Sequence, residues 1–401
     1  MKDAYILDLV RTPRGRGKVN GSLHEVKPIT LFSTVLKALK ERNHLPTEYV
    51  DDIILGCVTP VGEQGGNIAK AAALYSDWDE RVAGLQLNRL CGSSLEAINL
   101  AAMKIRSGWE NLVVAGGVES MSRVAMGSDG GPLMFDPAVN AKVNYIPQGV
   151  SADLVATLNG YTREDLDQYA LRSIQRATKA MSDGLFDASM VPVFDMNQLV
   201  VLDKEEHLRS DSTLEGLSVL PAAFEKQGAT GFDDMAIMKY PFLEKINHLH
   251  TAGNSSGIVD GASAILIGSA DIAKQLNLKP RAKIIAASVV GSEPTIMLDG
   301  TIPSTKKALS LVGMKASDID LWEANEAFAA PVLHFIDHYG LDIDNVNVNG
   351  GAISMGHPLG ATGGMLMVNL VDELERRSLS TGMVTMCMAG GMGVSTIIEL
   401  C

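Results

Sequence analysis

The sequence is short of cysteine and of long apolar runs, and each shortage excludes a class of protein. Four cysteines among 401 residues are too few for a disulfide framework, and their spacing contains no metal-binding pair. This cysteine usage fits a reducing compartment, so we expect a cytoplasmic protein. The apolar runs are too short to span a bilayer. The N-terminal one contains Asp8, which favours a first strand over a signal peptide.

Positive charge is also scarce, with 34 Lys and Arg against 47 Asp and Glu and a net charge of −13. We therefore expect no nucleic-acid partner, because nothing basic enough to follow a phosphate backbone is present. One basic run contains Arg11, Arg14, Arg16 and Lys18. It is interpreted first as a solvated loop and second as an aid in binding an anionic ligand. A hydrophobic content of 46% is typical of a soluble α/β enzyme.

Strands and helices alternate through the first part of the chain, which predicts a parallel sheet covered on both faces. The expected strands cover residues 1–10, 51–58, 84–88 and 111–117, and the expected helices cover residues 30–42, 67–75 and 91–105. From residue 122 to residue 250 the periodicity is patchy. A single clear helix is predicted there, over residues 162–183 with Thr162 at its cap. Such a segment is typical of a lid or a binding insertion.

The second half repeats the first in the order and kind of its elements. The corresponding segments are residues 281–290, 319–323, 346–350, 366–377 and 383–393. Two copies of one α/β unit, the first carrying a long insertion, are therefore predicted. The expected boundaries give a first half over residues 1–121, an insertion over 122–250, a completion of the first half over 251–271 and a second half over 272–401.

Cys91 lies where an apolar strand turns into a helix. Because N–H groups at a helix start favour negative charge, we expect a thiol there to ionise, with a pKa that can drop to roughly 3.5–7.5. The thiolate is the form that attacks a carbonyl carbon. The alternative is a buried, inert cysteine.

His357 lies in the glycine-rich turn of the second copy that mirrors the turn of Cys91. If the copies face each other, the two helix starts converge and these residues become neighbours. Pro358 fits a first helical position. A general base and electrophile role is favoured for His357 over a core or surface role.

Two further residues follow apolar strands. Cys387 ends one strand ahead of a glycine-rich turn, where a thiol could carry a proton to and from carbon; the alternative is a buried strand cysteine. Asn325 follows another strand, and its amide could hold a water that donates to an oxyanion. A plain helix N-cap is the alternative for Asn325, and taken alone the favoured one.

The remaining candidate residues give weaker indications of function. His248 and His250 could form a metal pair, but no third ligand is evident, so no metal site is expected. Ser255 and Ser256 are expected to open a helix and could bind a phosphate or amide of a ligand, or merely cap the helix. Cys57 and Cys401 are interpreted as structural or incidental.

Four ordered motifs together resemble the thiolases, the acetyl-CoA acyltransferases, over the whole chain. They read Asn88-x-x-Cys91-x-Ser, Asn325-Glu-Ala-Phe, Gly350-Gly-Ala-Ile-x-x-Gly-His357-Pro-x-Gly and Cys387-x-x-Gly-Gly-x-Gly393. The resemblance implies a duplicated, five-layered α/β/α/β/α fold, assembled as a homodimer or homotetramer. It also implies cleavage of a 3-oxoacyl-CoA by coenzyme A, or the reverse Claisen condensation.

The resemblance further implies a role for each matched residue. Cys91 takes the acyl group as a thioester, and His357 activates it. His357 and a water held by Asn325 stabilise the acetyl-CoA enolate. Cys387 moves the proton at the acetyl carbon. The N–H groups of Cys91 and Ala389 form a second oxyanion hole over the thioester carbonyl.

The implied ligands are acyl-CoA and coenzyme A as substrates, with no permanently bound cofactor and no membrane partner. Ser256, Ala327 and Phe328 match positions that line the coenzyme A channel. Gly92 and Ser94 depart from the alanine and glycine of many members, and Ala389 replaces a common glycine while keeping its N–H.

The segment from residue 224 to residue 250 is longer than in short-chain biosynthetic members and resembles thiolases for bulky acyl groups, including steroid side chains. Two alternatives remain. One is a 3-oxoacyl synthase of the same superfamily, which lacks a second catalytic cysteine. The other is a non-catalytic acyl-CoA carrier, against which the intact set of Cys91, His357 and Cys387 argues.

Overall fold

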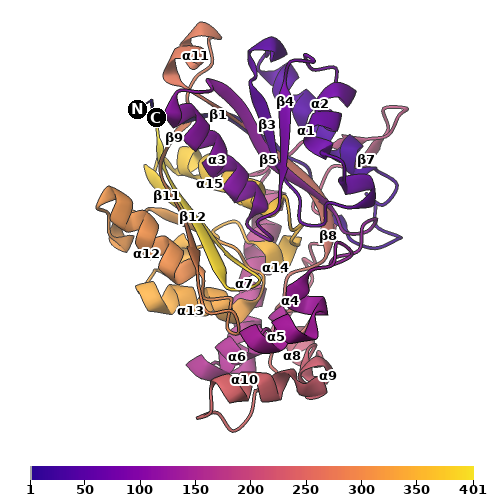
Figure 1. The fold of residues 1–401 in the computed structure, drawn as a ribbon, viewed down its shortest axis with the longest axis vertical. Coiled ribbons are helices and arrows are strands. Elements are labelled where there is room, and N and C mark those ends of the chain that lie inside the picture. The colour runs from indigo at the N-terminus through magenta and orange to yellow at the C-terminus, as the bar shows by residue number, and fades with distance from the viewer. Residues whose placement is uncertain (1) are drawn as a thin grey trace.

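The computed structural model describes residues 2–401, and its sheet is built from two halves of one topology (Figure 1). In the first half, the spatial order is β1-β8-β5-β3-β4, and β2 pairs with β8. These strands are β1 (Tyr5–Arg11), β2 (Gly15–Arg16), β3 (Asp52–Gly56), β4 (Ala83–Leu87), β5 (Leu112–Ser120) and β8 (Val259–Gly268).

The second half repeats this order as β9-β12-β11-β10, and a parallel bridge between Trp322 and Val346 stands where the fifth strand would lie. Its strands are β9 (Ala282–Gly291), β10 (Leu321–Ala324), β11 (Thr381–Met388) and β12 (Met392–Leu400). Antiparallel pairing of β1 with β9 at Tyr5 and Ile6 joins the two halves. The matching orders confirm the predicted duplication.

The prediction of a wholly parallel sheet is wrong. Among the paired strands of residues 2–401, β3 pairs in parallel with β4 and β5, and β10 pairs in parallel with β11, whereas the other pairs of this sheet are antiparallel. The predicted strand 383–393 is in fact a hairpin. Gly390 and Gly391, both with φ of 77°, turn the chain directly from β11 into β12, and so short a connection permits only antiparallel pairing.

Helices cover and separate the half-sheets, giving five layers. α1 (Pro28–Arg42) and α2 (Ile68–Tyr75) pack on the outer face of the first half-sheet. α3 (Ser93–Ser107) and α15 (Thr362–Arg377) lie between the half-sheets, where Ile98 and Leu366 share one core with Ile265 and Val384. α12 (Thr301–Val312) and α13 (Ala329–Tyr339) cover the outer face of the second half-sheet. The expected α/β/α/β/α arrangement is confirmed.

The starts of α3 and α15 meet in the middle layer. The Gly364 N–H donates to Ser94 Oγ at 2.9 Å. Gly363 lies so close to α3 that a Cβ atom there would stand 2.6 Å from the Leu95 nitrogen. Glycine thus allows the two helices to touch backbone to backbone, and the predicted convergence of the helix starts is present.

The insertion is more regular than the sequence suggests, and many of its helices gather at one end of the molecule (Figure 1). Its elements are α4 (Pro132–Phe135), α5 (Pro137–Val143), α6 (Gln148–Asn159), α7 (Arg163–Ser182), β6 (Val193–Phe194), β7 (Val200–Leu202), α8 (Leu214–Ser218), α9 (Glu225–Gln227) and α10 (Asp233–Lys239). The α7 prediction is confirmed, with a capping box between Thr162 and Asp165. The prediction of a single helix missed α6, because α6 is buried over most of its first nine residues and so shows little amphipathic periodicity.

Two local predictions are wrong. No helix begins at Ser255 or Ser256; Asn254 Oδ1 accepts from the Thr251 N–H, and the chain continues as an extended segment into β8. Pro358 is not the first residue of α15, which starts at Thr362, because the Pro358 carbonyl closes a separate turn. The two short helices left to name are α11 (Ala270–Gln275) and α14 (Ala352–Met355). Among the helices of residues 2–401, none has the length and apolar character needed to cross a membrane.

Candidate active site

Cys91 lies in a strained turn between β4 and α3. Leu90, just before it, has a φ of 50°, a left-handed conformation that is unusual for leucine. The Asn88 side chain holds this turn: its Oδ1 accepts from the Leu90 N–H at 2.8 Å, and its Nδ2 donates to the Val58 carbonyl at 2.9 Å. Gly92 is the N-cap of α3. The turn therefore presents Cys91 at the helix start, as predicted.

The electrostatic prediction for Cys91 is wrong. Burial raises the pKa of the Cys91 thiol to about 11, although the N–H groups of Cys91 and Ala389 and the Gln148 side chain act to lower it. The helix start cannot offset the loss of water around a sulfur that is 5% exposed. The resting group is therefore a thiol, and it needs a base before it can attack.

His357 has its proton placed by its neighbours. Its Nδ1 lies 2.6 Å from Thr362 Oγ1, and the Thr362 hydroxyl donates its only proton to the Pro358 carbonyl at 2.9 Å. The hydroxyl therefore accepts from His357, so Nδ1 carries the proton and Nε2 carries the lone pair, which the Asn325 Nδ2 donor faces at 3.3 Å. Burial, followed by the charge of Arg14, lowers the pKa of His357 to about 3. This imidazole is a neutral base.

Asn325 connects β10 to His357. Its N–H donates to the Thr385 carbonyl at 3.0 Å, which fixes it beside β11. Its Nδ2 lies 3.3 Å from His357 Nε2, and its Oδ1 is buried without a partner. The alternative of a helix N-cap is wrong, because α13 starts at Ala329 with Phe328 as its N-cap. An amide with a free, buried oxygen beside a base is suited to orienting a polar substrate atom or a water.

Cys387 is the next-to-last residue of β11, and its side chain is 3% exposed. Burial first, and then the electrostatic interaction with Cys91, raises the pKa of Cys387, so the two sulfurs lie within electrostatic reach of each other. The end of β11 packs against the start of α3, since a Cβ atom on Gly92 would stand 2.5 Å from Met388 Sδ. The structure thus gathers Cys91, Cys387 and Ala389 at one point.

The predicted coenzyme A residues also meet. The Ser256 N–H donates to the Ala327 carbonyl at 2.9 Å, and Ser255 forms an antiparallel bridge with Phe328. The Phe328 ring makes an edge contact with Phe224, with ring centroids 5.7 Å apart. Two short segments from opposite halves of the chain therefore form one wall.

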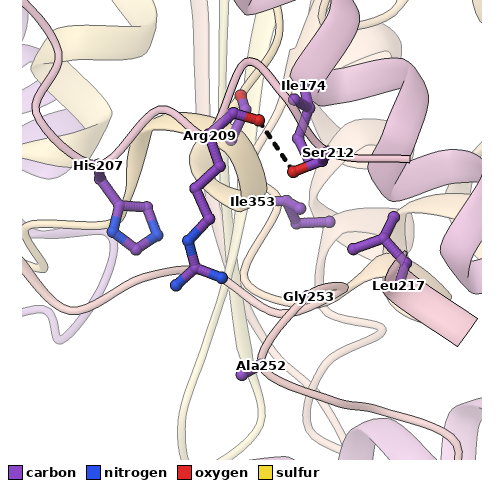
Figure 2. Close-up of a pocket in the computed structure, with 9 residues that line it drawn as sticks. Ile174, His207, Arg209, Ser212, Leu217, Ala252, Gly253 and Ile353 are labelled. Carbon is purple, nitrogen blue, oxygen red and sulfur yellow. Dashed lines mark hydrogen bonds between the residues drawn. The ribbon is translucent and has the colours of Figure 1, made fainter. Parts of the chain in front are cut away.

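A small pocket opens beside this wall, next to Ala252 and Gly253 of the same segment (Figure 2). Figure 2 shows the Arg209 side chain extending between His207 and the loop that carries Gly253. The Arg209 carbonyl accepts from Ser212 Oγ at 2.9 Å, which fixes the backbone and leaves the guanidinium in the pocket. Burial and then nearby Arg209 lower the pKa of His207 to about 4, so the local field is positive.

The imidazoles of His248 and His250 are engaged by protein groups. His248 lies between Asp153 and Asp233, at 2.8 and 3.0 Å, and His250 Nδ1 lies 2.7 Å from the same Asp153. The Ala330 N–H reaches His250 Nε2 at 3.3 Å. Within residues 2–401, no cluster of three His, Cys, Asp or Glu side chains has the geometry to hold a metal ion.

The site contains residues that the sequence analysis missed. Thr362 sets the tautomer of His357, and its position five residues after His357, as the first residue of α15, was the available signal. Gln148 and Tyr145, both within electrostatic reach of the Cys91 sulfur, come from the insertion, and no motif marked them. Arg209 lies in a stretch without periodicity. Cys57 is buried and Cys401 exposed, and both are free thiols.

Comparison with known proteins gives one family over most of the chain. Residues 4–236 match the family model "Thiolase, N-terminal domain", and residues 278–400 match "Thiolase, C-terminal domain". The 3-oxoadipyl-CoA/3-oxo-5,6-dehydrosuberyl-CoA thiolase of Escherichia coli is 38% identical, and the 3-ketoacyl-CoA thiolase of Cronobacter sakazakii is also 38% identical, each over 100% of both chains. The crystal structure of the Bacillus anthracis acetyl-CoA acetyltransferase superimposes with a TM-score of 0.87 at 34% identity, covering 100% of this chain and 99% of that one.

Proposed function

The chain belongs to the thiolase family, and we propose that Cys91, His357 and Cys387 carry out the thiolase reaction in it. The protein is an enzyme that splits a 3-oxoacyl-CoA with coenzyme A into acetyl-CoA and a shortened acyl-CoA, or runs the reverse condensation. The observation that carries the assignment of roles is the hydrogen-bond chain from His357 through Thr362 to Pro358, because it puts the proton on Nδ1 and leaves Nε2 as the ring's proton acceptor in the buried site.

The first half-reaction begins with the Cys91 thiol. His357 Nε2 accepts the thiol proton as the sulfur forms a bond to C3 of the 3-oxoacyl-CoA. The bond between C2 and C3 then breaks, and its electron pair stays with the acetyl-CoA fragment as an enolate. The Cys387 thiol donates its proton to C2 of that enolate, which releases acetyl-CoA and leaves the shortened acyl group on Cys91.

The second half-reaction returns the acyl group to coenzyme A. Cys387, now a thiolate, accepts the proton of the incoming coenzyme A thiol, and the new thiolate attacks the Cys91 thioester. Cys91 leaves as a thiolate and regains the proton held by His357. All groups then stand in their starting protonation states.

Two sets of donors stabilise the oxyanions. The N–H groups of Cys91 and Ala389 lie at the sulfur and would face the thioester oxygen. His357, once protonated, and a water oriented by Asn325 would stabilise the enolate oxygen. The free buried Oδ1 of Asn325 supports this role, because such an atom requires a partner that the protein does not supply.

Coenzyme A is assigned to the pocket of Figure 2 and to the wall formed by Ser256, Ala327 and Phe328, as a substrate and not as a resident cofactor. The Arg209 guanidinium would pair with its phosphates. Replacing Arg209 by Gln should raise the KM for coenzyme A about tenfold with little change in kcat, whereas Arg209→Lys should recover part of the loss. An unchanged KM in Arg209→Gln would place the phosphates elsewhere.

Assembly as a homodimer or homotetramer is supported by β4, an edge strand of the sheet that exposes Leu85. Light scattering of the purified protein tests this. Cys91 and Cys387 must stay reduced to act as proposed, which supports a cytoplasmic location. We place the unit boundaries after residues 121, 250 and 271, since β5 ends at Ser120 and β8 restores the first half-sheet after the insertion.

The length of the segment 224–250 supports a 3-oxoacyl-CoA substrate with a bulky acyl group. A thiolysis panel from acetoacetyl-CoA to long-chain and sterol-derived 3-oxoacyl-CoAs tests this, and activity confined to acetoacetyl-CoA would overturn it. In the same panel, Cys387→Ala should lose thiolysis. Full activity in that variant would favour a 3-oxoacyl synthase, which needs no second cysteine.

A further inference from the structure

We propose that Glu119 is a positioning residue that fixes His357 relative to Cys91. The proposal rests on the roles given to these two residues above. Glu119 is the next-to-last residue of β5, the middle strand of the first half-sheet, and its side chain is 1% exposed. Burying a carboxylate is costly unless donors hold it. The donors that hold Glu119 come from both halves of the chain.

Four N–H groups surround this carboxylate. Its Oε2 accepts from the Val58 N–H at 2.8 Å and from the Gly360 N–H at 2.9 Å, and its Oε1 accepts from the Thr59 N–H at 3.1 Å and from Gln64 Nε2 at 2.8 Å. A carboxylate offers about four acceptor sites, so these donors occupy the whole group. They act against burial, which raises the pKa of Glu119. None of them can accept a carboxyl proton, so the contacts fit the ionised form.

On one side, Glu119 is connected to the turn of Cys91. The Val58 carbonyl accepts from Asn88 Nδ2 at 2.9 Å. The other end of the same amide, Asn88 Oδ1, accepts from the Leu90 N–H at 2.8 Å, directly before Cys91. Glu119 therefore holds, through Val58 and Asn88, the turn that presents the nucleophile.

On the other side, Glu119 is connected to the loop of His357. Gly360 follows His357 by three residues and precedes Thr362, the first residue of α15, whose Oγ1 bonds the ring. The loop lies close against β5, since a Cβ atom on Gly360 would stand 2.7 Å from Glu119 Oε2 and 2.7 Å from the Val118 carbonyl oxygen. The loop therefore has little freedom to move away from the carboxylate.

A single oxygen thus bonds two loops that belong to different halves of the chain. The first half carries Cys91 and the second carries His357, so their separation depends on contacts that cross between the halves. Proton transfer from the thiol to Nε2 requires the two groups to be aligned. Glu119 meets this need without touching the substrate, because its bonds end on the backbone of both loops.

The neighbouring strand offers a control. Glu119 pairs with Gly261 of β8, and the residue before Gly261 is Asp260, which is also fully buried. Because neighbouring residues of a strand face opposite sides of the sheet, Asp260 points away from the loop of His357. Its carboxylate accepts from the N–H and the hydroxyl of Ser122, at 2.8 and 2.6 Å. Asp260→Asn therefore alters a buried carboxylate beside Glu119 without disturbing either loop.

The test begins with thiolysis by Glu119→Asp. Aspartate keeps the charge and both oxygens, but its shorter side chain cannot reach both loops, since β5 is held between β3 and β8. We expect kcat to fall by about 10-fold to 100-fold, the loss that a misplacement of about 1 Å produces. The KM for coenzyme A should change less than about twofold, because no partner of Glu119 lines the coenzyme A pocket. Asp260→Asn should keep both constants of the wild type.

The second readout is the rate at which iodoacetamide alkylates Cys91 at neutral pH, followed by peptide mass spectrometry. With a pKa of about 11, the thiol reacts at this pH when His357 takes its proton. A displaced His357 slows alkylation, whereas a merely loosened fold exposes the sulfur and speeds it. We expect slower alkylation in Glu119→Asp and in His357→Asn, no further slowing when the two are combined, and the wild-type rate in Asp260→Asn.

The outcomes separate this inference from the proposed function. If His357→Asn is slow, the inference is overturned by a wild-type kcat in Glu119→Asp, by unchanged or faster alkylation there, or by further slowing in the combined variant. A wild-type kcat and alkylation rate in His357→Asn would overturn the role of His357 as base, and this inference with it. Should Glu119→Asp fail to fold, Gly360→Ala displaces the same contact from the other side, and the same results are expected from it.

Discussion

Replacing Thr362 by Val would remove the hydroxyl that orients His357 while keeping nearly the same volume. The 2.6 Å contact with Nδ1 is lost, and the ring is left with a buried N–H that has no acceptor. An unsatisfied buried donor costs about 1–3 kcal/mol. If that cost appears in the transition state, kcat/KM falls by about 5-fold to 150-fold. The ring can also adopt the other tautomer, which would place a proton on Nε2 and block its action as a base.

The assay is coenzyme A-dependent thiolysis, with Thr362→Ser as the matched control because it keeps the hydroxyl. We expect Thr362→Ser to stay within about threefold of wild type and Thr362→Val to lose kcat more than KM. Far-ultraviolet circular dichroism checks that both variants fold. Wild-type kcat in Thr362→Val would refute the assignment of the proton to Nδ1.

Two further predictions concern stability. Hydrogen bonds to Asp153 and Asp233 raise the pKa of His248 to about 9. The stabilisation that protonated His248 gives is therefore complete below its unfolded pKa near 6.5 and is lost as the pH rises to about 9. The difference in Tm between wild type and His248→Gln should be wide at pH 6 and close by pH 10, and a difference independent of pH would contradict this. Gly363→Ala should lower the free energy of unfolding by about 1–3 kcal/mol, because the new Cβ would meet the backbone of α3. Gly216→Ala is the control, since a Cβ has room there, and it should change the free energy of unfolding by less than about 0.5 kcal/mol. Equal effects of the two substitutions in denaturant titrations would argue against the close contact of α15 with α3.

The duplication could be predicted because each copy keeps its own local pattern of apolar strands and glycine turns. From it followed the meeting of the starts of α3 and α15, which the Ser94–Gly364 hydrogen bond shows. The predicted site residues lie where strand ends and helix starts converge, and those positions are fixed by topology. Topology is encoded by short stretches of sequence, so it is within reach of sequence analysis.

The burial of individual side chains and the shifts in their pKa could not be predicted from the sequence, because both depend on residues distant in the chain. The pKa of Cys91 rises because the insertion and the Ala389 turn enclose its sulfur. In the basic run, Arg16 and Lys18 are exposed as predicted, but Arg11 and Arg14 are buried, because both bond Glu205, which lies 191 positions after Arg14 in the chain. α6 escaped notice because a helix buried on most sides has no periodicity to detect.

The central claim, that Cys91 carries the acyl group, is tested most directly by peptide mass spectrometry after mixing the protein with a 3-oxoacyl-CoA in the absence of coenzyme A. The account predicts an adduct on the Cys91 peptide with the mass of the acyl group shortened by two carbons, and none in Cys91→Ser. An unmodified Cys91 peptide under conditions where acetyl-CoA is released, or an adduct on Cys387 instead, would contradict it.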